Sequence, residues 1–156
     1  MNSPLDPHHL SGIGQQALDE VLSGFLALDA TPSIAPEESE LASIQGWLMG
    51  QVPLQADRRS GWVRITLPEP LASRAADHLF GPGIGDPTDL IGEFTNLVAG
   101  RIASGLATHG LTFTLHTPTV QRLGIPPGHH PGQVRSHWRF WDHPLTLDIL
   151  VTEHPT

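Results

Sequence analysis

The sequence contains no cysteine and no lysine, and its eight basic residues are all arginines. Without cysteine, neither a disulfide framework nor a thiolate metal site is available, and a reducing compartment is compatible with the composition. A net charge of −8 provides no basic stripe for phosphate backbones, so we expect no nucleic-acid partner. No segment approaches the roughly 20 apolar residues of a membrane span, and the N-terminus lacks a charged leader pattern. We therefore expect a cytoplasmic protein without membrane contact.

The length of 156 residues suits one core, so we expect a single domain over residues 1–156, with residues 1–13 flexible. Apolar spacings of three and four predict helices at 15–28 and 89–109, and a shorter helix between Pro68 and Phe80. Alternating apolar and polar residues predict a strand pair within 41–68, and strands within 111–120, 133–141 and 145–151. This order favours an α+β fold with a mainly antiparallel sheet and long helices packed on it.

The helix predicted at 89–109 carries two opposite stripes. With Asp89 set at zero and about 100° per residue, Glu93 falls near 40°, Asn96 near 340° and Gly100 near 20°. Ile91, Phe94, Val98 and Ile102 fall on the opposite side, and burying them would hold the helix against the sheet. The sequence therefore predicts that the polar stripe faces solvent, where another molecule can reach it.

Two interpretations of this stripe remain about equally good on its residues alone. In the first, Asp89 and Glu93 only complement the positive end of the helix and Asn96 is one solvated residue among many. In the second, the stripe is a working surface, because asparagine and glycine are unfavourable inside an exposed helix. Gly100 beside an amide and a carboxylate would let another backbone come close.

The segment DLIGEFTNLVAG, followed by a proline in HTPTV, resembles the signature of the CheX/CheC family of chemotaxis phosphatases. That signature has an Asp or Ser, a Glu four residues on, an Asn three after that, and a Pro about one strand later. Asp89, Glu93, Asn96 and Pro118 match it in type and order, with 21 residues between the last two. The resemblance covers roughly residues 40–152 and implies a CheC-like fold.

The resemblance also implies a function. The chain would dephosphorylate the aspartyl phosphate of a CheY-like response regulator in chemotaxis or another two-component pathway. Asn96 would orient the attacking water and Glu93 would pair with the regulator's lysine, while Asp89, the first motif position, would shape the surface that contacts the partner. Gly100 lies outside the signature, and its place on the stripe predicts that it also contacts the partner. Mg²⁺ would come from the phosphorylated partner, and the chain would have no cofactor of its own. An aspartyl phosphate is already reactive, so positioning a water supplies much of the acceleration.

One departure from the CheC pattern leaves an alternative open. CheC proteins carry the motif on two helices, but the helix around GQQALDEVLSGFLALD lacks a Glu-x-x-Asn pair, so one active face is expected. Proteins with a single motif resemble CheX, which implies a homodimer that pairs through sheet edges. The alternative is a non-catalytic CheX-like module that binds or regulates a signalling partner.

The sequence has ten histidines, and two of them, His129 and His130, are adjacent in the segment PPGHHPG, which suggests a metal site. A Pro/Gly-rich loop gives adjacent histidines no fixed geometry, and no carboxylate pattern nearby completes a site. We therefore expect solvated loop histidines and no metal site.

Overall fold

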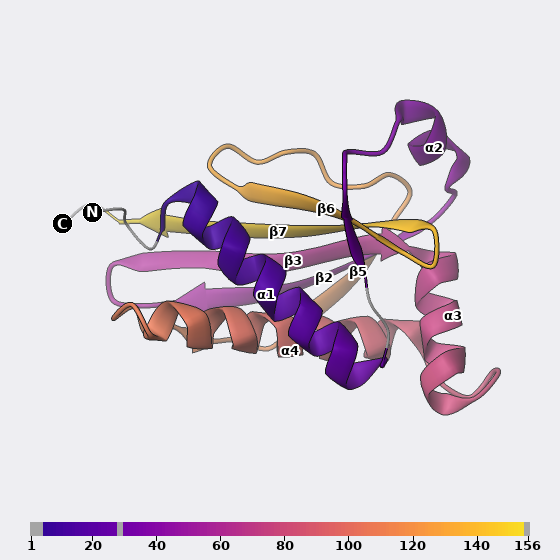
Figure 1. Cartoon of the computed structure of the whole chain (residues 1–156), viewed down its shortest axis with the longest axis horizontal. Coiled ribbons are helices and arrows are strands. Elements are labelled where there is room, and N and C mark those ends of the chain that lie inside the picture. Colours follow the sequence, from indigo (N-terminus) through magenta and orange to yellow (C-terminus); the bar gives the residue numbers. More distant parts are fainter. Residues whose placement is uncertain (1–4, 28–29, 155–156) are drawn as a thin grey trace.

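The computed structural model describes residues 5–27 and 30–154 as an α+β fold (Figure 1). In chain order its elements are α1 (Pro7–Phe25), β1 (Thr31–Ser33), α2 (Glu38–Ser43), β2 (Trp47–Gln55), β3 (Arg59–Pro68), α3 (Glu69–Phe80), α4 (Pro87–Ala107), β4 (Thr114–Leu115), β5 (Thr119–Leu123), β6 (Val134–Phe140) and β7 (His143–Glu153).

The strands form one seven-stranded antiparallel sheet in the order β1-β6-β7-β3-β2-β4, and β5 also pairs with β2. Figure 1 shows α1 crossing in front of the sheet and α4 running along its lower side in this view. Helix α1 packs on β6 and β7, whereas α4 packs on β2 and β3. The expected α+β architecture with a mainly antiparallel sheet is therefore confirmed.

The period-two pattern of the central strands separates the two faces of the sheet. On β7, Leu145, Leu147 and Ile149 are at most 2% exposed and belong to the core beneath the helices. Asp148 alternates with them and so lies on the opposite face, where it is also completely buried. One face of the sheet is thus an apolar core, and the other carries a buried charge.

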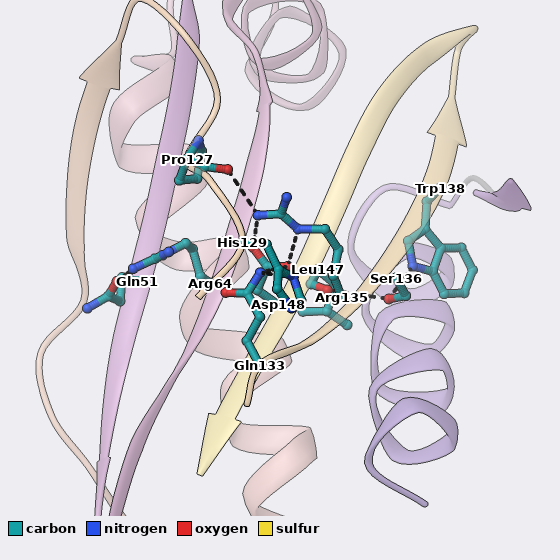
Figure 2. A network of polar contacts seen from close by, with 10 residues as sticks. All are labelled: Gln51, Arg64, Pro127, His129, Gln133, Arg135, Ser136, Trp138, Leu147 and Asp148. Carbon is teal, nitrogen blue, oxygen red and sulfur yellow. Dashed lines mark hydrogen bonds and ion pairs between the residues drawn. The ribbon is translucent and has the colours of Figure 1, made fainter. Parts of the chain in front are cut away.

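Figure 2 shows how that charge is satisfied. Arg135 on β6 donates from Nε to Asp148 Oδ1 at 2.7 Å and from Nη2 to Oδ2 at 3.0 Å. Its Nη2 also donates to the carbonyl of Pro127, in the loop between β5 and β6. Gln133, at the end of the same loop, donates to Asp148 Oδ1 at 3.4 Å. The β5–β6 loop is therefore fastened across the face of the sheet away from the helices.

Several predicted boundaries need correction. Helix α1 begins at Pro7 rather than at Gln15, so residues 7–13, expected to be flexible, are helical. The Asp6 side chain accepts a hydrogen bond from the backbone N–H of His8, and Pro7 occupies the first turn, where its missing N–H costs nothing. Residues 1–4 lie outside the described residues.

Between the first helix and β2 the chain contains the short elements β1 and α2, which the sequence patterns did not predict. The strand predicted within 111–120 is divided into β4 and β5, which extends to Leu123. At the other end of the sheet, the turn between β6 and β7 places two non-glycine residues, Trp141 and Asp142, at positive φ (48° and 63°).

Candidate functional site

Local residues cap the start of helix α4. The Asp86 carboxylate accepts hydrogen bonds from the N–H and the hydroxyl of Thr88, and Pro87 opens the helix. These hydrogen bonds, the backbone one first, lower the pKa of Asp86 below its ordinary value. The helix ends at Ala107, and Gly110 adopts a φ of 82° just beyond it. The predicted helix is confirmed with both ends two residues earlier in the chain than expected.

The buried face of α4 is the one predicted from spacing. Ile91, Phe94, Val98 and Ile102 are all at most 4% exposed and belong to the core. On the other side, Asp89 and Glu93 are exposed, whereas Asn96 and Gly100 are half-buried. Within residues 5–27 and 30–154, the side chains of Asp89, Glu93 and Asn96 make no hydrogen bond or ion pair with the chain. We call these three residues and Gly100 the polar stripe.

The half-burial of Asn96 has a cause in the tertiary structure. A Cβ placed on Gly92 would lie 3.5 Å from Cγ2 of Val120, and one placed on Gly100 would lie 4.0 Å from Cδ1 of Leu115. Asn96 is four residues from each glycine and therefore lies on the same side of the helix. The chain between Leu115 and Val120 thus passes along this side of α4, level with Asn96.

That passing segment contains a β-bulge. Leu115 pairs with Leu54, and the N–H of His116 donates to the Pro53 carbonyl, but Thr119 pairs with Gln51. Two residues, Thr117 and Pro118, therefore stand opposite the single residue Val52. A proline is tolerated at a bulge on an edge strand because it has no N–H to donate. The motif proline thus lies in the segment that passes the motif asparagine, although the two are distant in sequence.

On the side that faces the sheet, α4 packs against a glycine, Gly50, which has no side chain. A Cβ added at Gly50 of β2 would be 2.2 Å from Oγ1 of Thr95 and 3.0 Å from Cγ2 of Ile91. The Thr95 hydroxyl is buried and donates to the Ile91 carbonyl at 2.7 Å. Gly50 therefore sets how closely α4 approaches the sheet at Thr95, the residue before Asn96.

Charged side chains lie near the N-terminal end of the polar stripe. Arg122 of β5 forms an ion pair with Glu69, and its charge also acts on Asp86. The stripe itself contributes two carboxylates, Asp89 and Glu93, and no cation. Among the described residues, no group of three or more His, Cys, Asp or Glu side chains is arranged to hold a metal ion. An exposed carboxylate and a half-buried amide about one turn apart can engage a cation and a water on another molecule.

Sequence reasoning located α4 and its polar stripe but missed two features around it. The contact between Gly50 and α4 could not be predicted, because a glycine inside a strand does not indicate which helix will pack on it. The bulge has a weak signal, since the alternation in LTFTLHTPTV is interrupted by a proline.

His129 and His130 lie on the opposite side of the sheet from α4. There His129 Nδ1 is 3.2 Å from Gln133 Nε2, and the His130 ring meets Trp62 edge-on.

No protein-family model matches this sequence, and comparison with curated proteins finds no match. Comparison with solved structures defines the class: the chain has the fold of CheX and CheC-like proteins. The chemotaxis protein CheX from Vibrio vulnificus superposes with a TM-score of 0.78 at 21% identity, over 97% of this chain and 100% of that one. A CheC-like superfamily protein from Shewanella sp. PV-4 gives 0.76 at 21% identity, over 97% and 99%.

A third similar structure was solved as a complex. The CheX–CheY–BeF3–Mg²⁺ complex from Borrelia burgdorferi matches with a TM-score of 0.69 at 18% identity, over 92% of this chain and 98% of that one. The similarity of fold expected from the motif is therefore confirmed. Within the described residues, no helix is long and apolar enough to cross a membrane.

Proposed function

We propose that this protein dephosphorylates the aspartyl phosphate of a CheY-like response regulator in chemotaxis or a related two-component pathway. The observation that carries the proposal is the placement of Glu93 and Asn96 one turn apart on α4, without partners within the described chain. The fold supports it, because a CheX of the same fold was crystallised with CheY, BeF3 and Mg²⁺.

The proposed chemistry is hydrolysis within the regulator's own site. The Asn96 amide, which both donates and accepts hydrogen bonds, holds a water in line with the phosphorus. The water oxygen forms a bond to phosphorus as the bond to the aspartyl oxygen breaks, which releases phosphate and the free carboxylate. Glu93 pairs with the regulator's lysine, and Mg²⁺ bound by the regulator balances the phosphoryl charge. The chain itself supplies position rather than a nucleophile or a cofactor.

The remaining stripe residues have supporting roles in this proposal. Asp89 shapes the surface at the first turn, and Gly100 leaves room for the partner's backbone because it has no side chain. The half-burial of Asn96 supports its role, since the β4–β5 segment restricts the side chain before any partner arrives.

Two further expectations belong to the proposal. The protein would act in the cytoplasm, where receiver domains are phosphorylated. It would also form a homodimer through a sheet edge, and the edges available for this are β1 and the β4–β5 segment. Light scattering on the purified full chain, combined with a dilution series, tests the dimer directly.

The decisive experiment measures phosphate loss from receiver domains encoded in the same genome, each phosphorylated by a small phosphodonor. We expect one of them to lose phosphate faster with wild-type protein, and Asn96→Ala to reduce this acceleration by about 100-fold or more. Ser104→Ala, an exposed position further along α4, is the matched control and should behave as wild type. Equal rates of phosphate loss with and without the protein would exclude phosphatase activity. Stable binding of a receiver domain that survives Asn96→Ala would then favour a non-catalytic module.

A further inference from the structure

Four large apolar side chains stand out as exposed among the described residues: Ile34 (88%), Ile125 (78%), Ile84 (77%) and Phe80 (50%). Phe80, the last residue of α3, and Ile84 lie in one short segment, residues 80–85, on the way from α3 to α4. We call this segment the α3–α4 tip. Exposed apolar groups that are gathered in one place are characteristic of interaction sites, whereas single ones are ordinary.

The α3–α4 tip is held in a defined conformation. The Gly83 N–H donates to the Asp77 carboxylate at 3.1 Å, and the Ile84 N–H donates to the Gly81 carbonyl at 3.3 Å. Gly81 and Gly83 take φ values of 94° and 72°. The Phe80 ring lies so close to Gly85 that an added Cβ would be 2.3 Å from its Cδ2. A segment fixed in this way loses little conformational entropy when a partner covers it.

The tip lies next to the polar stripe. Asp86, the residue that caps α4, follows Ile84 by two positions, and Glu93 is about 9 Å along the helix from Pro87. Helix α3 packs against α4, and Figure 1 shows α3 and its loop extending beyond α4 on the side away from the strands. A standard interface of about 800 Å² per partner has a radius of about 16 Å, which is enough to cover the tip and the stripe together.

We propose that Phe80 and Ile84 are the apolar anchor with which this protein binds its phosphorylated receiver domain, on an apolar patch beside the receiver's phosphorylation site. This inference rests on the proposed function and adds the source of affinity to it. Exposed charges such as Asp89 and Glu93 set orientation and association rate more than affinity, whereas a rigid apolar pair supplies affinity on burial.

The charges nearby argue for a receiver and against a second copy of this chain. In a two-fold symmetric dimer through the tip, each copy brings the same surface, so the acidic surfaces that carry Asp86, Asp89 and Glu93 would be brought close to one another. Like charges brought together across an interface are unfavourable, and the chain carries a net charge of −8. A receiver that presents a lysine beside its phosphoryl group is complementary to the same surface.

The test uses Ile84→Ser, with Ile125→Ser as a control matched in residue type and in exposure (77% and 78%). Ile125 lies in the β5–β6 loop. Both variants keep the full chain, and Phe80 is left intact because its ring supports the loop backbone. The probes are the receiver domains of the same genome, activated with beryllofluoride and Mg²⁺ for binding and phosphorylated for turnover.

We expect Ile84→Ser to raise the Kd for the activated receiver, and the KM for the phosphorylated one, about tenfold. Its kcat should stay at the wild-type value, and Ile125→Ser should change neither constant. Equal constants for Ile84→Ser and wild type would overturn the proposal. A shift of the free protein from dimer to monomer in Ile84→Ser would also overturn it, because the patch would then hold a second copy.

The two hypotheses fail in different ways. If the activated receiver binds, and binds less well to Ile84→Ser, but wild-type protein does not speed phosphate loss, then the anchor stands and the phosphatase activity does not. If Ile84→Ser has the same kcat and KM as wild type, the phosphatase activity stands and the anchor does not. If no activated receiver binds, both are refuted.

Discussion

The contact between Gly50 and α4 yields the sharpest prediction about the position of the polar stripe. In Gly50→Ala the new Cβ would lie 2.2 Å from Oγ1 of Thr95, a separation that real Cβ atoms do not show. Restoring an ordinary contact needs a displacement of about 1 Å, taken up by α4 because β2 is held on both sides by paired strands. We expect the free energy of unfolding to fall by about 1–3 kcal/mol, the usual cost of overpacking a core.

The same displacement should reach the proposed chemistry. Thr95 directly precedes Asn96, and a misplacement of about 1 Å in a positioning group can cost about 100-fold in rate. In a dephosphorylation assay that separates kcat from KM, Gly50→Ala should therefore lower kcat strongly. KM should change little, because the tip and the exposed carboxylates remain available to the partner.

A compensating variant distinguishes displacement from simple loss of stability. Thr95→Ala removes the oxygen that the new methyl would strike, leaving Ile91 Cγ2 at 3.0 Å and the Cβ of residue 95 at 3.1 Å as the closest remaining atoms. The double variant Gly50→Ala/Thr95→Ala should recover both stability and kcat relative to Gly50→Ala alone, as measured by urea denaturation and by turnover. No recovery in the double variant, or a wild-type response of Gly50→Ala, would refute the steric argument.

Three predictions concern the other face of the sheet and the β6–β7 turn. Burial lowers the pKa of His137 below its ordinary value of 6.5, so the unfolded chain takes up a proton before the folded protein does as the pH falls. Stability measured by urea should therefore decrease as the pH drops below about 6.5, and less so in His137→Gln; identical pH profiles would contradict this. Arg135→Met leaves the buried Asp148 carboxylate without its ion pair and should cost about 3 kcal/mol, whereas Arg135→Met/Asp148→Leu should regain most of this loss. A double variant less stable than the single one would show that the pair itself holds the sheet together. Asp142→Gly should raise the free energy of unfolding by about 0.5–1 kcal/mol, because glycine adopts the φ of 63° without strain and the ion pair lost to Arg139 is long, at 3.9 Å, with a fully exposed carboxylate. A lower melting temperature for Asp142→Gly would contradict the strain argument.

The position of α4 could be predicted from sequence because its signals are local. Asp86 and Pro87 mark its start, the apolar spacing marks its buried face, and Gly110 follows its end. The exposure of Asp89 and Glu93 follows from the same spacing and is confirmed. Their roles, and that of Asn96, stay predictions, since position on a helix does not establish chemistry.

The features that sequence could not predict depend on contacts between distant segments. Asn96 and Gly100 are half-buried because β4 and β5 pass beside them, and that path is set by pairing with β2. Strand β1 has three residues and exists through its pairing with β6. The early start of α1, in contrast, had a local signal in Asp6 and Pro7, which the apolar periodicity did not include.

The bulge at Thr117 and Pro118 changes how this edge of the sheet tolerates differences in length. Because two residues there stand opposite one, a chain shorter by one residue at this point could pair with β2 without interruption. The residues on each side would keep their partners and their faces. A difference of one residue at this point is therefore absorbed locally. Two proteins can then place the helix asparagine and the strand proline in the same positions although the number of residues between them differs by one.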